Sequence, residues 1–296
     1  GSGEQTQRID LKKYGYTSDD KIQGFHFINS DSLLIYTYKE SEISLLSLSK
    51  GKIWAKSLFG GRGPKAEWVK PVVSQANPMV YDAAGQKVYF IGFFGGEMPL
   101  KSLDARQRIM VSYDMTSTRF ETGINYPEFY WGKNWGGSGG YRVPFYTFLP
   151  DSREFLISFI ADHTLAKVSG DLEVAQQVQA HSGQFDTISS IPSSSWLFDY
   201  TSSHARHDFY LQHPAYGPVY YDQANKHVIR MTKMPQKVEG QMDYTMIALN
   251  KSLEIVSEYP FPGELKAFRP LSLPNGLWFV NDAASDPNHL VFSQLK

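Results

Sequence analysis

The chain has 296 residues, of which 42% are hydrophobic and 20% charged, and its formal net charge at pH 7 is -1. This composition is that of an ordinary globular protein, which argues against a disordered chain, and the scattered Lys and Arg residues offer no basic surface for nucleic acid. The absence of cysteine excludes disulfides, thiolate metal sites and a cysteine nucleophile. No apolar run approaches the roughly 20 residues of a membrane-spanning helix.

The N-terminal residues alternate in polarity and predict a β-strand. The segment QRIDLKKYGY, residues 7–16, has no hairpin partner of its own, so we expect it to pair elsewhere in the fold. Residues 1–3 are interpreted as the remnant of an expression tag, and residues 4–296 as a single domain.

A unit of four predicted strands then recurs along the chain. It starts with a hairpin whose turn is rich in Asp, Asn, Gly and Pro, the residues that tolerate turn geometry. After the first four of these hairpins comes a second one, and four antiparallel strands per unit are typical of a β-propeller blade. The turns of the first hairpins lie at residues 29–31, 82–85, 150–152, 222–225 and 274–276, and those of the second near Gly51, Thr116, Gly170 and Lys251.

The spacing of the units leaves the number of blades open between five and six. The five first turns are anchored by Asn29, Asp82, Asp151, Asp222 and Asn275. These anchors are 53 to 71 residues apart, further than in compact blades of roughly 40–50 residues. Residues 184–212, with short aromatic runs at 195–200 and 208–212, have room for a further blade, so we prefer six.

The last unit supplies only one strand after its first hairpin. We therefore expect the N-terminal strand to pair with the last blade and to close the ring, because closure removes exposed strand edges. The predicted fold class is thus an all-β propeller with six blades, five of which can be recognised in the sequence.

Three segments resemble a known group of propellers. They are GGRGPKAEW at residues 60–68, YDQANKHVIRM at residues 221–231, and the terminal FRPLSLPNGLWFVND with HLVFSQLK. They resemble the TolB-like six-bladed propeller lipoproteins of Bacteroides and related gut bacteria, a family without a settled activity. The resemblance implies export by a lipoprotein signal and residence in the periplasm or at the outer membrane. It carries over no catalytic residue, because the shared segments are turn and strand signatures.

Residues 126–146 concentrate aromatic residues and glycines in one long connection between units. Exposed rings on a flexible segment can stack on sugar rings or other flat ligands. The alternative is that the rings fold under the connection as a satellite of the core. As candidates for ligand binding we select Tyr130, Trp131, Trp135 and Tyr141.

The segment from His204 to His213 holds three of the eight histidines, with Asp208 among them. Imidazole suits zinc, copper and nickel, so His204, His207 and His213 are weak candidates for a metal site. Their spacing matches no known ligand motif, and ordinary polar residues of a loop account for them better. Arg206 lies beside His207 and is a candidate for bidentate binding of an anion.

These observations predict a cell-envelope propeller that binds a partner protein or a glycan through one face, without catalysis or a cofactor. We expect a monomer, no nucleic-acid partner and a lipid anchor on the precursor. The alternative is a hydrolase or lyase with a divalent metal such as calcium in the central channel, which requires convergent acidic residues or histidines there. A third alternative is an intracellular interaction propeller.

Overall fold

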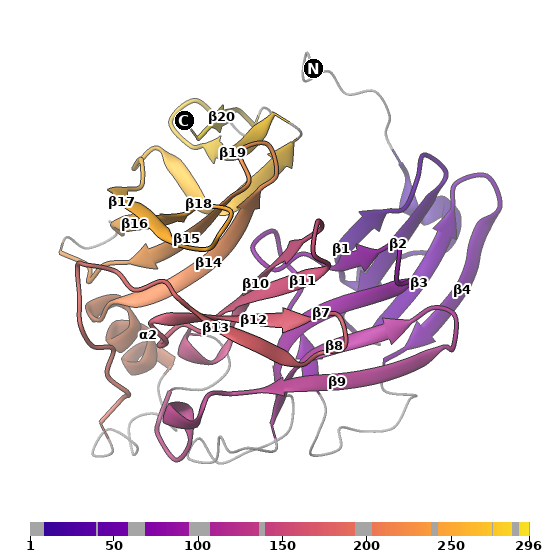
Figure 1. Cartoon of the computed structure of the whole chain (residues 1–296). Helices are drawn as coiled ribbons and strands as arrows, with labels where there is room; N and C mark the ends of the chain where they lie inside the picture. The colour runs from indigo at the N-terminus through magenta and orange to yellow at the C-terminus, as the bar shows by residue number, and fades with distance from the viewer. Residues whose placement is uncertain are drawn as a thin grey trace.

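The computed structural model describes residues 9–39, 41–58, 69–94, 107–135, 140–192, 203–237, 242–273, 275–285 and 290–295. Their strands form five antiparallel sheets that follow one another in chain order. Figure 1 shows these sheets arranged like the blades of a fan, from the N-terminal sheet at the right to the C-terminal sheet at the upper left. The protein is an all-β propeller, and its blades are numbered 1 to 5 in chain order.

Blades 1 and 2 contain the first nine strands. Blade 1 consists of β1 (Ile22–Phe27), β2 (Ser32–Thr37), β3 (Glu42–Ser47) and β4 (Gly51–Ser57). Blade 2 consists of β5 (Val69–Pro71), β6 (Val80–Asp82), β7 (Lys87–Phe94), β8 (Arg108–Asp114) and β9 (Arg119–Asn125), and both β5 and β6 pair with β7.

Blades 3 to 5 contain the remaining strands. Blade 3 consists of β10 (Phe145–Leu149), β11 (Glu154–Ser158), β12 (Thr164–Ser169) and β13 (Val174–Gln179). Blade 4 consists of β14 (Ala215–Asp222), β15 (His227–Lys233), β16 (Tyr244–Leu249) and β17 (Ile255–Pro260). The described part of blade 5 consists of β18 (Leu265–Leu273), β19 (Gly276–Asn281) and β20 (Phe292–Gln294).

The few helical segments lie in the connections. They are the 3-10 helices η1 (Leu11–Tyr14), η2 (Ser18–Asp20), η3 (Glu128–Tyr130) and η4 (Gly140–Arg142), and the α-helix α2 (Ser203–Gln212). No helix in the described part of the chain is long and apolar enough to cross a membrane.

The repeated hairpins predicted from the sequence are confirmed. In every blade, the strands directly before and after the expected first turn form an antiparallel pair. These turns lie near residues 29, 82, 150, 222 and 275. Asp82 accepts a hydrogen bond from the backbone N–H of Ala84 at 3.1 Å, and Asp222 accepts one from Ala224 at 3.0 Å. These side chains therefore stabilise their own turns, which explains why Asp recurs at this place.

The preference for six blades is wrong, because the structure has five. In the segment 184–212, where the sequence left room for a further blade, the aromatic run at 208–212 lies in the α-helix α2, and residues 184–192 form no strand. The second aromatic run, at 195–200, lies outside the described residues. The aromatic residues Phe209 and Tyr210 pack against the partly helical connection that contains Tyr141, which favours a helix over a strand at this position.

The described N-terminal residues do not form the strand that was expected to close the ring. Residues 11–14 form the 3-10 helix η1, and Gly15 ends it with a φ of 85°. The Tyr14 hydroxyl donates to the carbonyl oxygen of Leu48 at 3.0 Å, and Tyr16 is buried against blade 1. Leu11 and Tyr14 are three residues apart and so lie on one side of a 3-10 helix, where both pack on blade 1. Residues 7 and 8 of the predicted strand lie outside the described residues.

The core consists of separate apolar clusters between neighbouring blades. One lies between blades 1 and 2, one between blades 2 and 3, one between blades 3 and 4, and one between blades 4 and 5. Strands buried on both faces carry consecutive apolar residues, as in β2 and β11. The packing between blades therefore fixes the positions of the blade ends relative to one another, and the connections begin at these ends.

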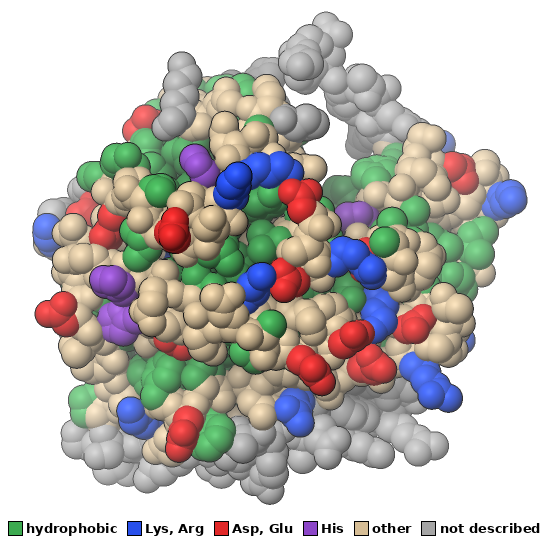
Figure 2. All heavy atoms as spheres, in the orientation of Figure 1, with side chains coloured by type: hydrophobic (Ala, Val, Ile, Leu, Met, Phe, Trp, Pro, Cys, Tyr) green, Lys and Arg blue, Asp and Glu red, His purple; other side chains and the backbone are tan. Residues whose placement is uncertain are grey.

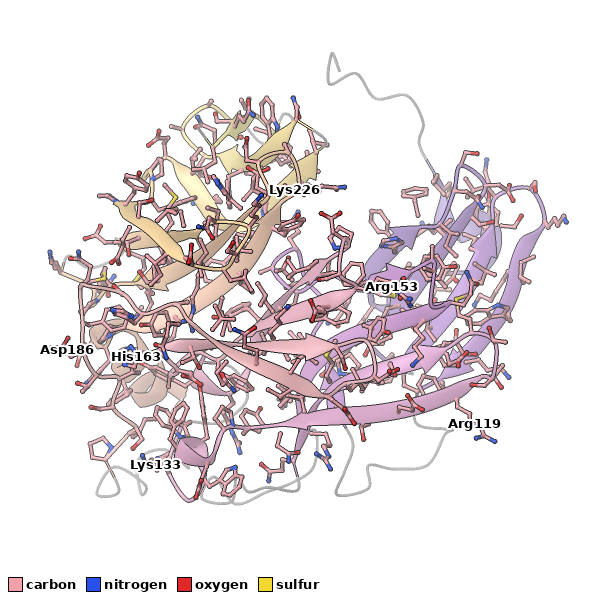
Figure 3. All side chains as sticks on the ribbon, in the orientation of Figure 1. Arg119, Lys133, Arg153, His163, Asp186 and Lys226 are labelled. Atoms are coloured by element: carbon pink, nitrogen blue, oxygen red, sulfur yellow. The ribbon has the colours of Figure 1, made fainter. Side chains whose placement is uncertain are left out.

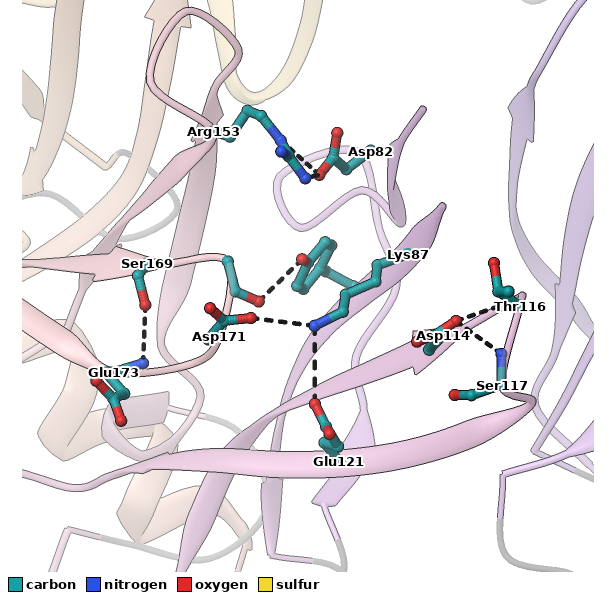
Figure 4. Close-up of polar contacts among 12 residues, drawn as sticks. Asp82, Lys87, Asp114, Thr116, Ser117, Glu121, Arg153, Ser169, Asp171 and Glu173 are labelled. Carbon is teal, nitrogen blue, oxygen red and sulfur yellow. Dashed lines mark hydrogen bonds and ion pairs between the residues drawn. The ribbon is translucent and has the colours of Figure 1, made fainter. Parts of the chain in front are cut away.

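Ion pairs join neighbouring blades on the face that carries the repeated turns, which we call the turn face. Arg153 of blade 3 donates to Asp82 of blade 2 from Nε at 3.0 Å and from Nη2 at 2.6 Å, as Figure 4 shows. Lys226 of blade 4 donates to Asp151 of blade 3 at 2.8 Å. Arg153 and Lys226 occupy equivalent turns of consecutive blades (Figure 3). Basic and acidic side chains are intermixed on the surface seen in Figure 2.

A buried arginine joins blades 3 and 4. The side chain of Arg230, on β15, is fully buried, and its guanidinium lies 3.6 Å from the centre of the Tyr216 ring. It donates to Ser158 Oγ at 3.1 Å and to three carbonyl oxygens of blade 3, those of Phe159, Asp162 and Ala180, at 3.2, 2.6 and 2.9 Å. Burial lowers the pKa of Arg230 to about 10, so the group stays charged at neutral pH.

Replacing Arg230 with Met should lower the free energy of unfolding by about 3 kcal/mol, because buried carbonyl oxygens would lose their donors. Urea denaturation followed by circular dichroism measures this change. Arg153→Met is the matched control, since it removes an arginine whose side chain is half exposed and should shift the midpoint much less. Equal losses in the two variants would contradict the role of Arg230 in joining blades 3 and 4.

Candidate binding cleft

A cleft of ≈ 710 Å³ lies between blades 4 and 5. It opens on the face opposite the turns, where the connections from each blade to the next emerge, and which we call the connection face. Its described walls come from the end of β15, both ends of the β15–β16 connection, the segment between β17 and β18, and the first half of β18. The residues used below are Lys237, Asp243, Tyr244, Lys266, Phe268 and Arg269, all of which line the cleft.

An irregularity in β18 builds one wall of the cleft. Leu265 pairs with Asn281 and Pro270 with Phe279, so β18 advances by five residues while β19 moves by two. The extra residues form a bulge that contains Lys266 and Arg269, both exposed. Bulges re-aim side chains and are frequent beside functional sites. Pro270 follows the bulge, where its missing N–H leaves no ladder bond unmade.

Aromatic residues form the inner end of the cleft. Phe268 packs against Tyr244 with ring centres 5.8 Å apart and against Phe145, the first residue of β10, at 5.9 Å. Both Phe268 and Tyr244 are half-buried. Phe145 and Phe268 belong to the innermost strands of blades 3 and 5, so aromatic side chains meet here beside the axis of the propeller. Burial raises the pKa of Tyr244, which keeps its hydroxyl protonated and able to donate.

Basic side chains outnumber acidic ones in the described lining of the cleft. Lys266 forms a salt bridge with Asp282 at 2.8 Å. Lys237 and Arg269 form no salt bridge within the described part of the chain. Asp243 is the one acidic residue among the described residues of the lining. The described lining thus presents two cations without a salt bridge to a described residue, one carboxylate and a pair of aromatic rings.

The rim of the cleft toward blade 3 is held by Glu258 of β17. Its carboxylate accepts hydrogen bonds from the Gly183 N–H at 2.8 Å, from Thr245 Oγ1 at 3.0 Å and from the Ser182 hydroxyl. Gln184, the next residue along, lines the cleft. The Ser182 N–H also donates to the Tyr216 hydroxyl at 3.0 Å. These bonds fix the segment after β13 against blade 4.

Lys233, at the end of β15, holds α2 against blade 4. It is 1% exposed, and its Nζ donates to the carbonyl oxygens of Tyr210 and His213, at the C-terminal end of α2. A helix leaves such carbonyl groups without partners of its own. Burial lowers the pKa of Lys233 to about 8, although its bonds to carbonyl oxygens favour the charged form.

The structure places the four aromatic candidates inside the molecule. Tyr130, Trp135 and Tyr141 are at most 3% exposed, and Trp131 is half-buried against the same cluster. Their polar atoms bond to the protein: the Tyr130 hydroxyl, for example, accepts from the Ala161 N–H at 2.8 Å. These rings form the satellite of the core that the sequence offered as the alternative, so a binding role for them would require the segment to open.

The candidates of the histidine segment fall on α2 or just after it. The side chains of His204, Arg206 and His207 lie outside the described residues. His213 stacks on Phe209 with ring centres 3.8 Å apart, and its Nδ1 bonds to the Phe209 carbonyl oxygen at 2.8 Å. Within the described residues, no three His, Asp or Glu side chains group so that they could hold a metal ion. The calcium site considered from the sequence therefore has no donor set in this part of the chain.

Sequence reasoning missed the cleft residues. The segment KAFRP at residues 266–270 places two cations on either side of an aromatic residue and before a proline. Lys266 and Arg269 are three residues apart, so a regular strand would place them on opposite faces, and nothing local in the sequence indicates that a bulge turns both toward one cavity.

A solved structure of a DUF4221 family member from Bacteroides vulgatus has the same fold. The chains are 16% identical, the TM-score is 0.70, and the match covers 90% of this chain and 75% of that chain. At this identity the likeness establishes the propeller fold and agrees with a resemblance to propellers of Bacteroides. It leaves activity and location open.

Other solved propellers are less similar. Virginiamycin B lyase from Staphylococcus aureus is 12% identical with a TM-score of 0.38, and the match covers 94% of this chain and 86% of that one. The periplasmic gluconolactonase of Pseudomonas aeruginosa is 11% identical with a TM-score of 0.42, covering 90% and 66%. These scores are too low to support a functional argument. No family model and no curated protein matches the chain.

Trp135→Ala should lower the free energy of unfolding by about 3 kcal/mol, because it leaves a cavity in the cluster between blades 2 and 3. Thermal denaturation combined with urea titration measures the loss. Trp131→Ala is the control on the same segment, and since that side chain is half-buried it should lose less. A Trp135→Ala variant as stable as the wild type would show that the ring is not part of the core.

The stability of the wild type relative to Lys233→Met should increase as the pH rises from 7.5 to 9.5. Unfolded Lys keeps its proton up to a pKa of 10.5, whereas folded Lys233 loses it near 8, so in this window the unfolded chain binds more protons and higher pH favours folding. Taking the difference between the two proteins removes the contribution of buried tyrosines. Urea midpoints at several pH values test this, and a difference that is independent of pH would contradict the burial of a charged amine.

Proposed function

We propose that this protein is a binding protein without catalytic activity, which holds a glycan in the cleft between blades 4 and 5. The observation that carries the proposal is the cleft itself, in which half-buried aromatic rings and polar side chains surround one cavity. Concave sites that combine aromatic side chains with placed polar groups are a usual form of small-ligand sites.

The size of the cleft favours a glycan over a protein partner. Its volume of ≈ 710 Å³ falls within the range of about 300–1,000 Å³ that small-ligand sites occupy. A protein partner needs a much flatter surface of about 800 Å² on each side. The binding of a folded protein to this face is an outcome that the experiments below would reveal.

The chemistry of the walls also fits a sugar. A sugar ring has an apolar face, which aromatic side chains such as Tyr244 and Phe268 can cover, and an edge of hydroxyl groups, which polar side chains can bond. Within the described part of the chain the Tyr244 hydroxyl makes no hydrogen bond, so it is available to a ligand. The side chain of Asp243 can accept from sugar hydroxyls.

We also propose that the protein acts as a monomer at the bacterial cell envelope, in the periplasm or at the outer membrane, and that its precursor carries a lipid anchor. The support is the resemblance of its turn and strand segments to envelope propellers. Detection of a lipid-modified N-terminus on the natural protein, by mass spectrometry of a membrane fraction, would test this.

Glycan binding is tested by calorimetry and thermal shift against a panel of oligosaccharides, because a ligand that binds the folded state raises its melting temperature. Tyr244→Ala should weaken binding about tenfold by removing a stacking surface. Tyr259→Ala is the matched control, since Tyr259 lies on β17 outside the lining and is 52% exposed. The proposal fails if no oligosaccharide binds the wild type, or if Tyr244→Ala binds as tightly as Tyr259→Ala.

A further inference from the structure

We infer that the ligand of the cleft is an acidic oligosaccharide, whose sugar carboxylate pairs with Arg269 while its neighbouring hydroxyls bond to Asp243. This inference rests on the proposed function and adds the class of sugar. It follows from the charge balance, the position of the bulge and the mixture of groups within one cavity.

The charge balance indicates an anion. Of the three basic residues of the lining, Lys266 is neutralised by Asp282 at 2.8 Å. Lys237 and Arg269 have no acidic partner among the described residues, and Asp243 supplies one opposing charge. An anionic group entering the cleft therefore meets two exposed basic side chains that have no acidic partner among the described residues, while the carboxylate of Glu258 at the rim offsets part of their charge.

The bulge in β18 indicates which cation makes the direct contact. Arg269 lies within the bulge, directly after Phe268 and before Pro270, whose ring restricts the backbone. Its side chain thus starts from a fixed strand of the propeller, whereas Lys237 lies in a connection. A guanidinium matches the two oxygens of a carboxylate with parallel hydrogen bonds, and a sugar stacked on Phe268 would bring its carboxylate within reach.

Asp243 distinguishes an acidic sugar from a simple anion. A carboxylate in the lining repels phosphate and other compact anions that offer no donors. An acidic sugar has hydroxyl groups that can donate to Asp243 at a distance from the carboxylate that Arg269 holds. The aromatic pair Tyr244 and Phe268, with ring centres 5.8 Å apart, supplies the apolar surface for the ring between these two ends.

The test compares trigalacturonic acid with its carboxyl-reduced counterpart, a neutral trisaccharide of the same linkage. Calorimetry on the full chain should show the acidic form binding at least tenfold more tightly than the neutral form at low salt, because charge-assisted hydrogen bonds to a carboxylate are among the strong ones. Raising the salt concentration should reduce this preference.

Arg269→Gln should reduce the preference for the acidic form, measured as the ratio of the two dissociation constants, to about twofold or less. Arg119→Gln is the matched control, since Arg119 is an exposed arginine on β9 of blade 2, and Figure 3 shows it on the side of the molecule away from blades 4 and 5. Lys237→Gln is a second variant, expected to reduce the preference less than Arg269→Gln. Melting temperatures within about 2 °C of the wild type establish that the variants fold.

The outcomes separate the inference from the proposed function. If both forms bind the wild type equally, or if Arg269→Gln keeps the full preference, the inference is wrong and glycan binding stands. If neither form nor any neutral oligosaccharide binds, the proposed function fails together with the inference.

Discussion

The structure of the connection face depends on the contacts that the buried guanidinium of Arg230 makes. A charge without a carboxylate partner is costly to bury, and here one hydroxyl, three carbonyl oxygens and the face of Tyr216 offset that cost. The guanidinium is planar and its donors diverge, so all these bonds form together only when β15 sits at one height against blade 3. The end of β11, the β11–β12 connection and the residue after β13 are thereby fixed relative to blade 4.

The contacts of Arg230 also help to position the rim of the cleft. Tyr216, which lies under the guanidinium, accepts from the Ser182 N–H, and Glu258 accepts from Ser182 and from Gly183. The chain after β13 is therefore tied to blade 4 on both sides of Ser182, although it forms no strand. A binding site is held most accurately when its supporting groups are themselves bonded to regular strands, and both Tyr216 and Glu258 lie on strands of blade 4.

Local chemistry explains which predictions from the sequence succeeded. The turns were legible because Asp82 and Asp222 bond to backbone groups only two residues away, so each turn is determined by its own residues. The segment 184–212 left room for a sixth blade because a short aromatic run such as 208–212 has no clear period, and the packing of Phe209 and Tyr210 on a distant segment decides for the helix α2. The aromatic candidates Tyr130 and Trp135 could be read as surface or core, and only their neighbours in the fold place them inside.

By itself the sequence determined the all-β class, the four-stranded unit and the positions of its turns, because these follow from alternation and from residues that bond within a few positions of themselves. The tertiary structure alone decided the number of blades, the burial of the aromatic connection, and the meeting of Arg269, Phe268 and Tyr244 in one cleft. These features depend on contacts between strands far apart in the chain, and above all on a bulge in β18 whose register is set by pairing with β19. Such contacts form only when the blades pack, so no local sequence pattern predicts them.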